Sequence, residues 1–187
     1  MATGGATGRA TGRAGGRLTA AAVAAACALL AAAPAAAQVL GSDAAACNGG
    51  QGPAIRATIT GLKDTKGALK LELYPANEED FLAGDDDLAR RGKPFRRISV
   101  GVPAGGTAVM CIRVPQPGRW ALFAGHDRDG KPKFNFWSDG AGFPSARKIG
   151  RSRPKLEDAL IDVGPGVTHT TIRMQYLRGL GGFSPAS

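Results

Sequence analysis

Three aspartates and a histidine lie in the middle of the chain, and side chains of these two types can bind metal ions or transfer protons. His126 and Asp127 are followed by Asp129 and a glycine, and Asp139 comes ten residues later. Aspartates alternating before a glycine present carboxylate oxygens in a tight turn, as in many Ca²⁺ sites, although the pattern lacks the third ligand and final glutamate of an EF-hand loop. We expect no required cofactor, and Ca²⁺ bound by Asp127, Asp129 and Asp139 is the candidate ion. The alternative is a turn in which aspartates bond to nearby backbone.

His126 is the histidine best placed for acid–base chemistry, because neighbouring aspartates could orient its imidazole. A hydrolase would also need a nucleophile, and neither Ser138 nor Ser145 lies in a Gly-x-Ser-x-Gly elbow. We expect the commoner arrangement, in which the ring bonds to a backbone carbonyl group. The sequence therefore predicts no catalytic residue. The alternative is a periplasmic hydrolase that uses His126 with a nearby aspartate.

The same segment contains four aromatic residues, which are Phe134, Phe136, Trp137 and Phe143. They either pack over the end of the domain as a plug or form an apolar surface for a sugar, lipid or protein partner. We favour the plug, because a segment without strands needs a small core of its own. Basic side chains are concentrated just after it, at 147–155, where they are either ordinary loop surface or a contact for phosphate groups.

Alternation of apolar and polar residues predicts the strands that position this segment. The predicted strands are 54–60, 69–74, 97–102, 107–114, 119–125, 159–163 and 170–176. The first two are expected to form a hairpin, and one short helix is expected at 77–82. Residues 126–156 show no period, which is typical of functional or disordered loops. This pattern predicts an all-β fold, an antiparallel two-sheet sandwich of about seven strands of the immunoglobulin or transthyretin type; a partly open β-barrel is the alternative.

The first 37 residues are typical of a secretory signal peptide. They contain three arginines and no acidic residue, then an alanine-rich run at 18–33, and small residues precede Gln38. We expect cleavage after Ala37 and an exported protein, periplasmic or secreted. The alternative is a retained membrane anchor.

Cleavage would leave Cys47 and Cys111 in a compartment that permits disulfides, and no Cys-x-x-Cys pair indicates redox work. We therefore predict a Cys47–Cys111 disulfide that holds a lead-in segment, 38–53, onto a β-sandwich domain, 54–178. Residues 179–187 are expected to form a flexible tail.

Composition limits the remaining possibilities. The chain has 187 residues, of which 43% are hydrophobic, and its 28 glycines and 12 prolines exclude a long-helix protein. The formal net charge is +9, but the basic residues are scattered among acids, so we expect no nucleic-acid partner. The partners we consider are an envelope polymer, an anionic lipid surface or another envelope protein.

The order of several motifs resembles the bacterial domain-of-unknown-function family 2141, over about residues 47–178. The motifs are Gly61 to Lys63, Gly67 to Tyr74, Phe81 and Leu82, Pro115 to Ala121, His126 and Asp127, Gly142 and Phe143, and Tyr176. The resemblance implies an exported, small all-β domain with an aspartate- and asparagine-rich segment after the His–Asp pair. This chain departs from the family there, with Arg128 to Pro132 in place of the fuller run.

Together these features favour a non-enzymatic binding or envelope-accessory module that presents the 126–143 loop, since loops on rigid β scaffolds commonly recognise ligands. Besides the hydrolase, the alternative is a purely structural envelope protein that acts through an exposed edge strand.

Overall fold

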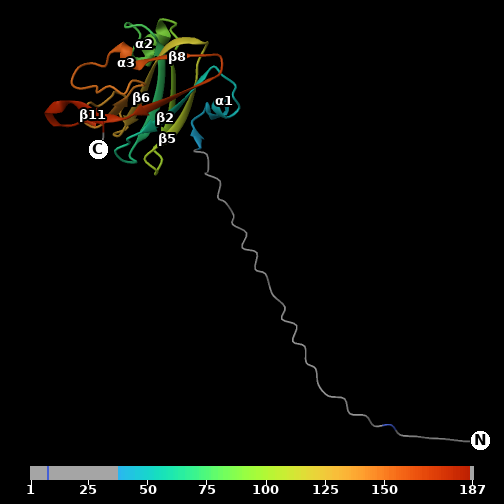
Figure 1. Cartoon of the computed structure of the whole chain (residues 1–187). Coiled ribbons are helices and arrows are strands. Elements are labelled where there is room, and N and C mark those ends of the chain that lie inside the picture. The colour runs from blue at the N-terminus through green and yellow to red at the C-terminus, as the bar shows by residue number, and fades with distance from the viewer. Residues whose placement is uncertain (1–7, 9–37, 186–187) are drawn as a thin grey trace, which may run out of the picture. The chain divides into compact units, whose positions relative to one another are not determined.

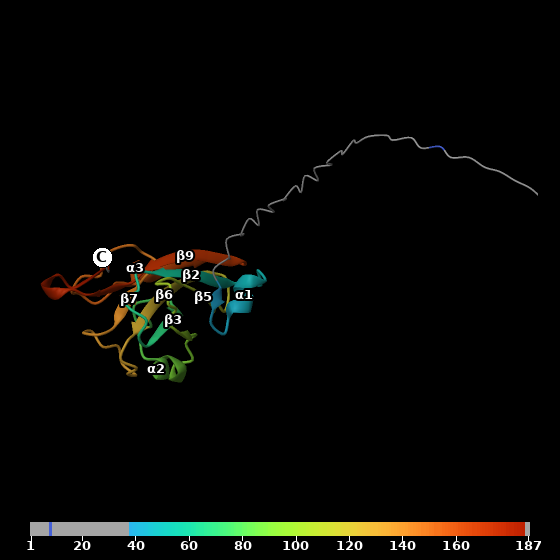
Figure 2. The same cartoon turned by 90° about the horizontal axis from the view of Figure 1, so that it is seen from below.

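Two β-sheets packed face to face make up the domain, and the computed structural model describes residue 8 and residues 38–185. The smaller sheet has the strand order β1-β5-β2-β9, and the larger has β11-β10-β7-β6-β3-β4 with β8 paired to β6. Figure 2 shows β9, β2 and β5 in one layer and β7, β6 and β3 in the other. The predicted all-β two-sheet sandwich is confirmed, and neither sheet closes into a barrel.

The elements are short, and the connections are mostly turns apart from the longer segments 128–139 and 143–155 (Figure 1). The strands are β1 (Val39–Leu40), β2 (Ala54–Thr60), β3 (Ala68–Pro75), β4 (Arg96–Gly101), β5 (Ala108–Arg113), β6 (Gly118–Asp127), β7 (Gly140–Gly142), β8 (Leu160–Val163), β9 (Val167–Arg173), β10 (Gln175–Leu177) and β11 (Phe183–Pro185). The helices are α1 (Ala44–Asn48), α2 (Asp85–Arg90), α3 (Leu156–Ala159) and one 3₁₀ turn, η1 (Gly179–Gly181).

The core lies between the sheets and is built from the inward positions of each strand. Ile55 and Ile59 on β2, Leu71 on β3, Met110 on β5 and Leu122 on β6 are all fully buried in one cluster. Alternating side chains of a strand point to opposite faces, so the predicted alternation selects these residues for the core. Burying each large aliphatic side chain contributes about 1.5–3 kcal/mol, which makes this cluster the main source of stability.

The predicted hairpin between the first two long strands is wrong, because β2 and β3 lie in different sheets. β2 pairs with β5 and in parallel with β9, whereas β3 pairs with β4 and β6. Both strands bury one face in the same core from opposite sides, and alternation cannot distinguish that arrangement from a hairpin. β1 also runs parallel to β5, so the smaller sheet is only partly antiparallel.

The predicted helix at 77–82 is also wrong. Asn77 begins a turn there, because its side-chain oxygen accepts the backbone N–H of Asp80, and the turn ends at Leu82 with φ of 59°. The helix instead starts at Asp85. Three successive aspartates occupy its first turn, where their negative charge interacts favourably with the positive end of the helix dipole. The acidic run at 85–87 therefore begins a helix as well as facing solvent.

The outer face of the smaller sheet is covered by the lead-in segment. Cys47 of α1 forms the predicted disulfide with Cys111 of β5, with Cα atoms 6.0 Å apart. α1 lies beside β5 in Figure 2, and the disulfide packs with Ala46 and Val109 in a second apolar cluster. The cysteine falls on the face of β5 opposite the core, as the strand pattern predicts.

Both predicted ends of the sandwich domain need adjustment. β1 precedes the predicted start at residue 54 and adds an edge strand to the smaller sheet. Residues 179–185, expected as a flexible tail, contain η1 and β11, whose Phe183 is buried and bonded to Gly150. The predicted signal peptide at 1–37 and its cleavage position lie outside the described residues, apart from Gly8. None of the helices in the described part of the chain is long and apolar enough to span a membrane.

Candidate functional site

The segment that follows β6 is fastened to the turn between β2 and β3. Arg128 reaches the Asp64 carboxylate with its guanidinium and also donates to the Ser138 carbonyl oxygen at 2.8 Å. These hydrogen bonds lower the pKa of Asp64 to about 2. Gly67 makes the close approach of the turn to β6 feasible, since its φ is +71° and a Cβ there would lie 1.9 Å from the Asp127 carbonyl oxygen.

His126 is a structural residue in this arrangement. Its ring is fully buried, and Nε2 lies 2.7 Å from the Lys66 carbonyl oxygen, so Nε2 carries the proton and donates it. The Tyr176 hydroxyl donates to Nδ1 at 2.7 Å and accepts the backbone N–H of Lys63. Burial lowers the pKa of His126 and raises that of Tyr176, so both are neutral near pH 7. The hydrogen bond to a backbone carbonyl that the sequence favours is present.

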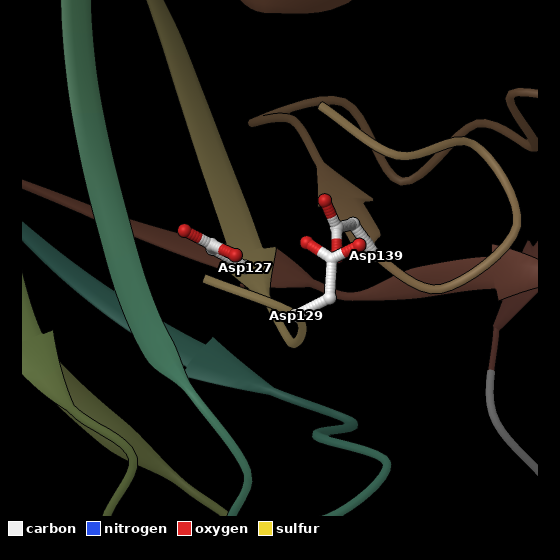
Figure 3. Close-up of side chains that lie close together, drawn as sticks. All are labelled: Asp127, Asp129 and Asp139. Atoms are coloured by element: carbon white, nitrogen blue, oxygen red, sulfur yellow. The ribbon is translucent and has the colours of Figure 1, made fainter. Parts of the chain in front are cut away.

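The three aspartates predicted to form an ion site do come together, as Figure 3 shows. One carboxylate oxygen from each of Asp127, Asp129 and Asp139 lies within 4.8 Å of the others. Asp139 is buried, Asp127 is partly buried at the end of β6, and Asp129 is exposed in the turn that follows. The sequence spacing thus identified a true cluster of carboxylates.

Each of these carboxylates already accepts hydrogen bonds from the protein. Asp127 binds Lys70 at 2.7 Å and the backbone N–H of Gly130. Asp129 accepts the Asn135 amide at 2.6 Å and the backbone N–H of Lys131. The remaining contacts, all to Asp139, come from the backbone N–H groups of Arg128 and Asn135 and from the Ser138 hydroxyl. Lys70 and Lys131 already pair with Asp127 and Asp129, so a cation would compete with these two lysines, and the hydrogen bonds close the loop on itself.

The four aromatic residues of the segment divide into two groups. Phe143 is buried and packs against Phe123 and Phe81 in a third apolar cluster on the outer face of the larger sheet. Phe134, Phe136 and Trp137 are 48%, 42% and 82% exposed. The predicted plug therefore describes Phe143 alone, because the other three rings stay exposed: Phe134 and Phe136 pack on Phe183 of β11, and Trp137 packs on Phe136.

The outer face of the larger sheet forms the floor of a pocket, and strand register selects its residues. Lys70 of β3 lies opposite Gly125 of β6, and Glu72 lies opposite both Phe123 of β6 and Arg97 of β4. Cross-strand partners share one face of a sheet, so these side chains all point away from the core. Glu72 bonds to Arg97 at 2.6 Å and accepts the Tyr74 hydroxyl, which fixes the polar part of the floor.

Two stretches of the long loop wall this floor and enclose a volume of about 380 Å³. One wall contains Lys131, Pro132, Phe134 and Phe136, and the other contains residues 151–154. The ring of Phe134 in the wall packs edge-on against the ring of Phe123 in the floor, with centroids 6.4 Å apart. Phe134 also packs on Phe183 of β11. Binding clefts for small molecules commonly begin at about 300 Å³, so the pocket is large enough for an organic ligand.

Sequence reasoning identified one side of this pocket and missed the other. Of the residues predicted from the sequence, four line it: Asp127, Phe134, Phe136 and Asp139. Four others do not: His126, Asp129, Trp137 and Phe143. Lys70, Glu72, Tyr74, Arg97 and Phe123 were not singled out, although alternation placed Lys70, Glu72 and Tyr74 on an outward face. The sequence does not indicate which loop covers that face, because this depends on contacts between distant parts of the chain.

The fold and this pocket define a two-sheet β-domain that carries a ligand-sized pocket on the outer face of one sheet. The chain belongs to the bacterial family described as "Uncharacterized protein conserved in bacteria (DUF2141)", whose model matches residues 57–171. The resemblance drawn from the sequence motifs is thus confirmed. The matched range includes the pocket floor and the aspartate cluster, whereas Cys47, Tyr176 and Phe183 lie outside it. Comparison with curated proteins and with solved structures gives no match.

Proposed function

We propose that the chain is an exported, non-enzymatic binding module and that its binding site is the pocket beneath the 126–143 loop. The observation that carries the proposal is the combination of rigid floor and apolar wall. Strands β3, β4 and β6 hold the polar floor, while Phe134 and Phe136 supply partly exposed aromatic surface within the same enclosed volume. Concave sites with aromatic walls and a few fixed polar groups are typical of small-molecule binding.

The chemistry of the segment favours binding over hydrolysis. His126 is the candidate acid–base group, but both of its ring nitrogens are engaged and its neutral ring lies outside the pocket lining. The Asp127 and Asp139 carboxylates that do reach the pocket are bonded to protein donors. These groups position the loop, and their engagement supports binding over a hydrolase based on His126.

Export is supported by the basic and alanine-rich amino terminus and by the disulfide, since disulfides persist mainly outside the cytoplasm. When the full chain is produced in a bacterium, the protein recovered from the periplasm or medium should begin at Gln38 by intact mass. Recovery only from the cytoplasm, with residues 1–37 still attached, would contradict export.

A neutral fluorescent probe tests the binding function. N-phenyl-1-naphthylamine brightens in apolar sites, and we expect saturable binding to the native protein that Phe134→Ala weakens by about tenfold through loss of the aromatic wall. Trp137→Ala is the matched control, because Trp137 lies in the same loop but does not line the pocket. Equal loss in both variants, or loss only in Trp137→Ala, would place binding on the exposed surface and contradict the proposal.

A further inference from the structure

We propose that the pocket binds an organic anion, with the anionic group held by Arg151 and Arg153 and an apolar body held against Phe123 and Phe134. This inference rests on the proposed binding function and adds the chemical class of the ligand. Five basic and three acidic residues line the pocket, which leaves an excess of positive charge. The distribution of ion pairs shows where that excess is available.

Half of the eight charged residues in the lining are paired with one another. Lys70 pairs with Asp127 at 2.7 Å, and Arg97 pairs with Glu72 at 2.6 Å. The third lining carboxylate, that of Asp139, accepts two backbone N–H groups. Two of the three lining carboxylates are thus paired with a cationic side chain of the same lining, and the third is held by backbone N–H groups before any ligand enters.

Arg151 and Arg153 differ from these residues. Neither guanidinium makes an ion pair with a carboxylate among the described residues; Arg151 donates to the Leu180 carbonyl oxygen at 3.4 Å and Arg153 to that of Phe81 at 3.0 Å. A guanidinium has five N–H donors, so each arginine keeps several for a ligand. Lys131, which also lines the pocket, is 3.5 Å from Asp129 and largely exposed.

The backbone holds both arginines beside the aromatic wall. Gly150 and Phe183 exchange two backbone hydrogen bonds, which anchors the strand-like segment just before Arg151. Phe183 also supports the rings of Phe134 and Phe136, with centroids 6.1 and 5.0 Å away. Phe183 thus helps to position both the arginines and the aromatic wall. A ligand with an anionic group and an apolar body would contact both of them.

A matched pair of dyes tests the inference. 8-Anilinonaphthalene-1-sulfonate is N-phenyl-1-naphthylamine with one added sulfonate, so the two probes differ in the anionic group alone. We expect the sulfonate to bind the native protein about tenfold more tightly or better, the gain of roughly one charge-assisted hydrogen bond. The double variant Arg151→Gln/Arg153→Gln should lose this advantage while its affinity for the neutral dye stays unchanged.

Arg119→Gln is the control, because Arg119 is exposed, pairs with Asp162 and does not line the pocket. It should retain the advantage of the sulfonate. Equal affinity of the two dyes for the native protein, or an advantage that survives in the double variant, would overturn the anion assignment while leaving the binding function intact. Failure of both dyes to bind the native protein would overturn the binding function and the inference together.

Displacement of the bound sulfonate dye distinguishes an anion with an apolar body from a free inorganic anion. Decanoate, which has an apolar chain, should displace the sulfonate dye, whereas inorganic phosphate at the same concentration should displace little because it leaves the aromatic wall uncovered. Displacement by phosphate as strong as by decanoate would overturn the requirement for an apolar body.

Discussion

Replacing Tyr176 with phenylalanine tests whether His126 is a structural residue. The hydroxyl donates to His126 Nδ1 and accepts the Lys63 backbone N–H. Lys63 is exposed, so water can replace its partner, but the His126 ring is fully buried and its nitrogen would lose its donor. Leaving one buried polar atom without a partner costs about 1–3 kcal/mol, so we expect the free energy of unfolding to fall by about 2 kcal/mol.

Urea denaturation followed by tryptophan fluorescence measures this change, and a double-mutant cycle with His126→Ala assigns it. Tyr176→Phe should cost about 1 kcal/mol less when the imidazole is already absent, because the acceptor is gone. Binding of N-phenyl-1-naphthylamine should be unchanged in folded Tyr176→Phe, since neither residue lines the pocket. A loss of stability below about 0.5 kcal/mol, or the same loss in both backgrounds, would refute the hydrogen-bonded arrangement.

Three further outcomes follow from contacts outside the pocket. Cys47→Ala/Cys111→Ala should lower the free energy of unfolding by about 4 kcal/mol in the chain-entropy model for a sequence separation of 64, and a loss below about 1 kcal/mol in urea would contradict this. Millimolar Ca²⁺ should not raise the melting temperature, because Lys70 and Lys131 already pair with two of the three aspartates; a rise that Asp127→Ala abolishes would restore the ion site. The lowered pKa of Asp64, about 2 against an ordinary 3.8, stabilises the fold above pH 4, and this contribution should disappear as the pH falls from about 4 to 2. Asp64→Asn should therefore flatten the stability profile over that interval, and an unchanged profile would argue against its bond to Arg128.

The long strands could be predicted because each has one face in the core. In β2 and β3 the buried residues alternate with polar ones over seven and eight residues, long enough for a period of two to be visible. β7, β10 and β11 have three residues each, which is too short for any period. The pairing of strands is harder to predict than the strands themselves, since the partners of β2 depend on whether the next strand joins the same sheet or the other one.

In the candidate site, too, the features set by neighbouring residues could be predicted, and those set by contacts between distant segments could not. The aspartate cluster was predictable because Asp127 and Asp129 share one turn and Asp139 follows in the same loop. The pocket was not, because Arg97 and Arg153 reach it from segments far apart in the sequence. Arg153 belongs to the basic stretch at 147–155, which the sequence marks as a possible phosphate contact, but no local pattern brings it to the same face as Arg97; sheet register and loop packing do so.

A crystal structure of the purified protein with 8-anilinonaphthalene-1-sulfonate tests the central claim most directly. The account predicts that the aromatic body of the dye lies against Phe123 and Phe134, over the outer face of β6, and that its sulfonate contacts Arg151 or Arg153. A dye molecule bound instead around Trp137 and Leu180, which are 82% and 88% exposed, with the pocket left to water, would contradict it.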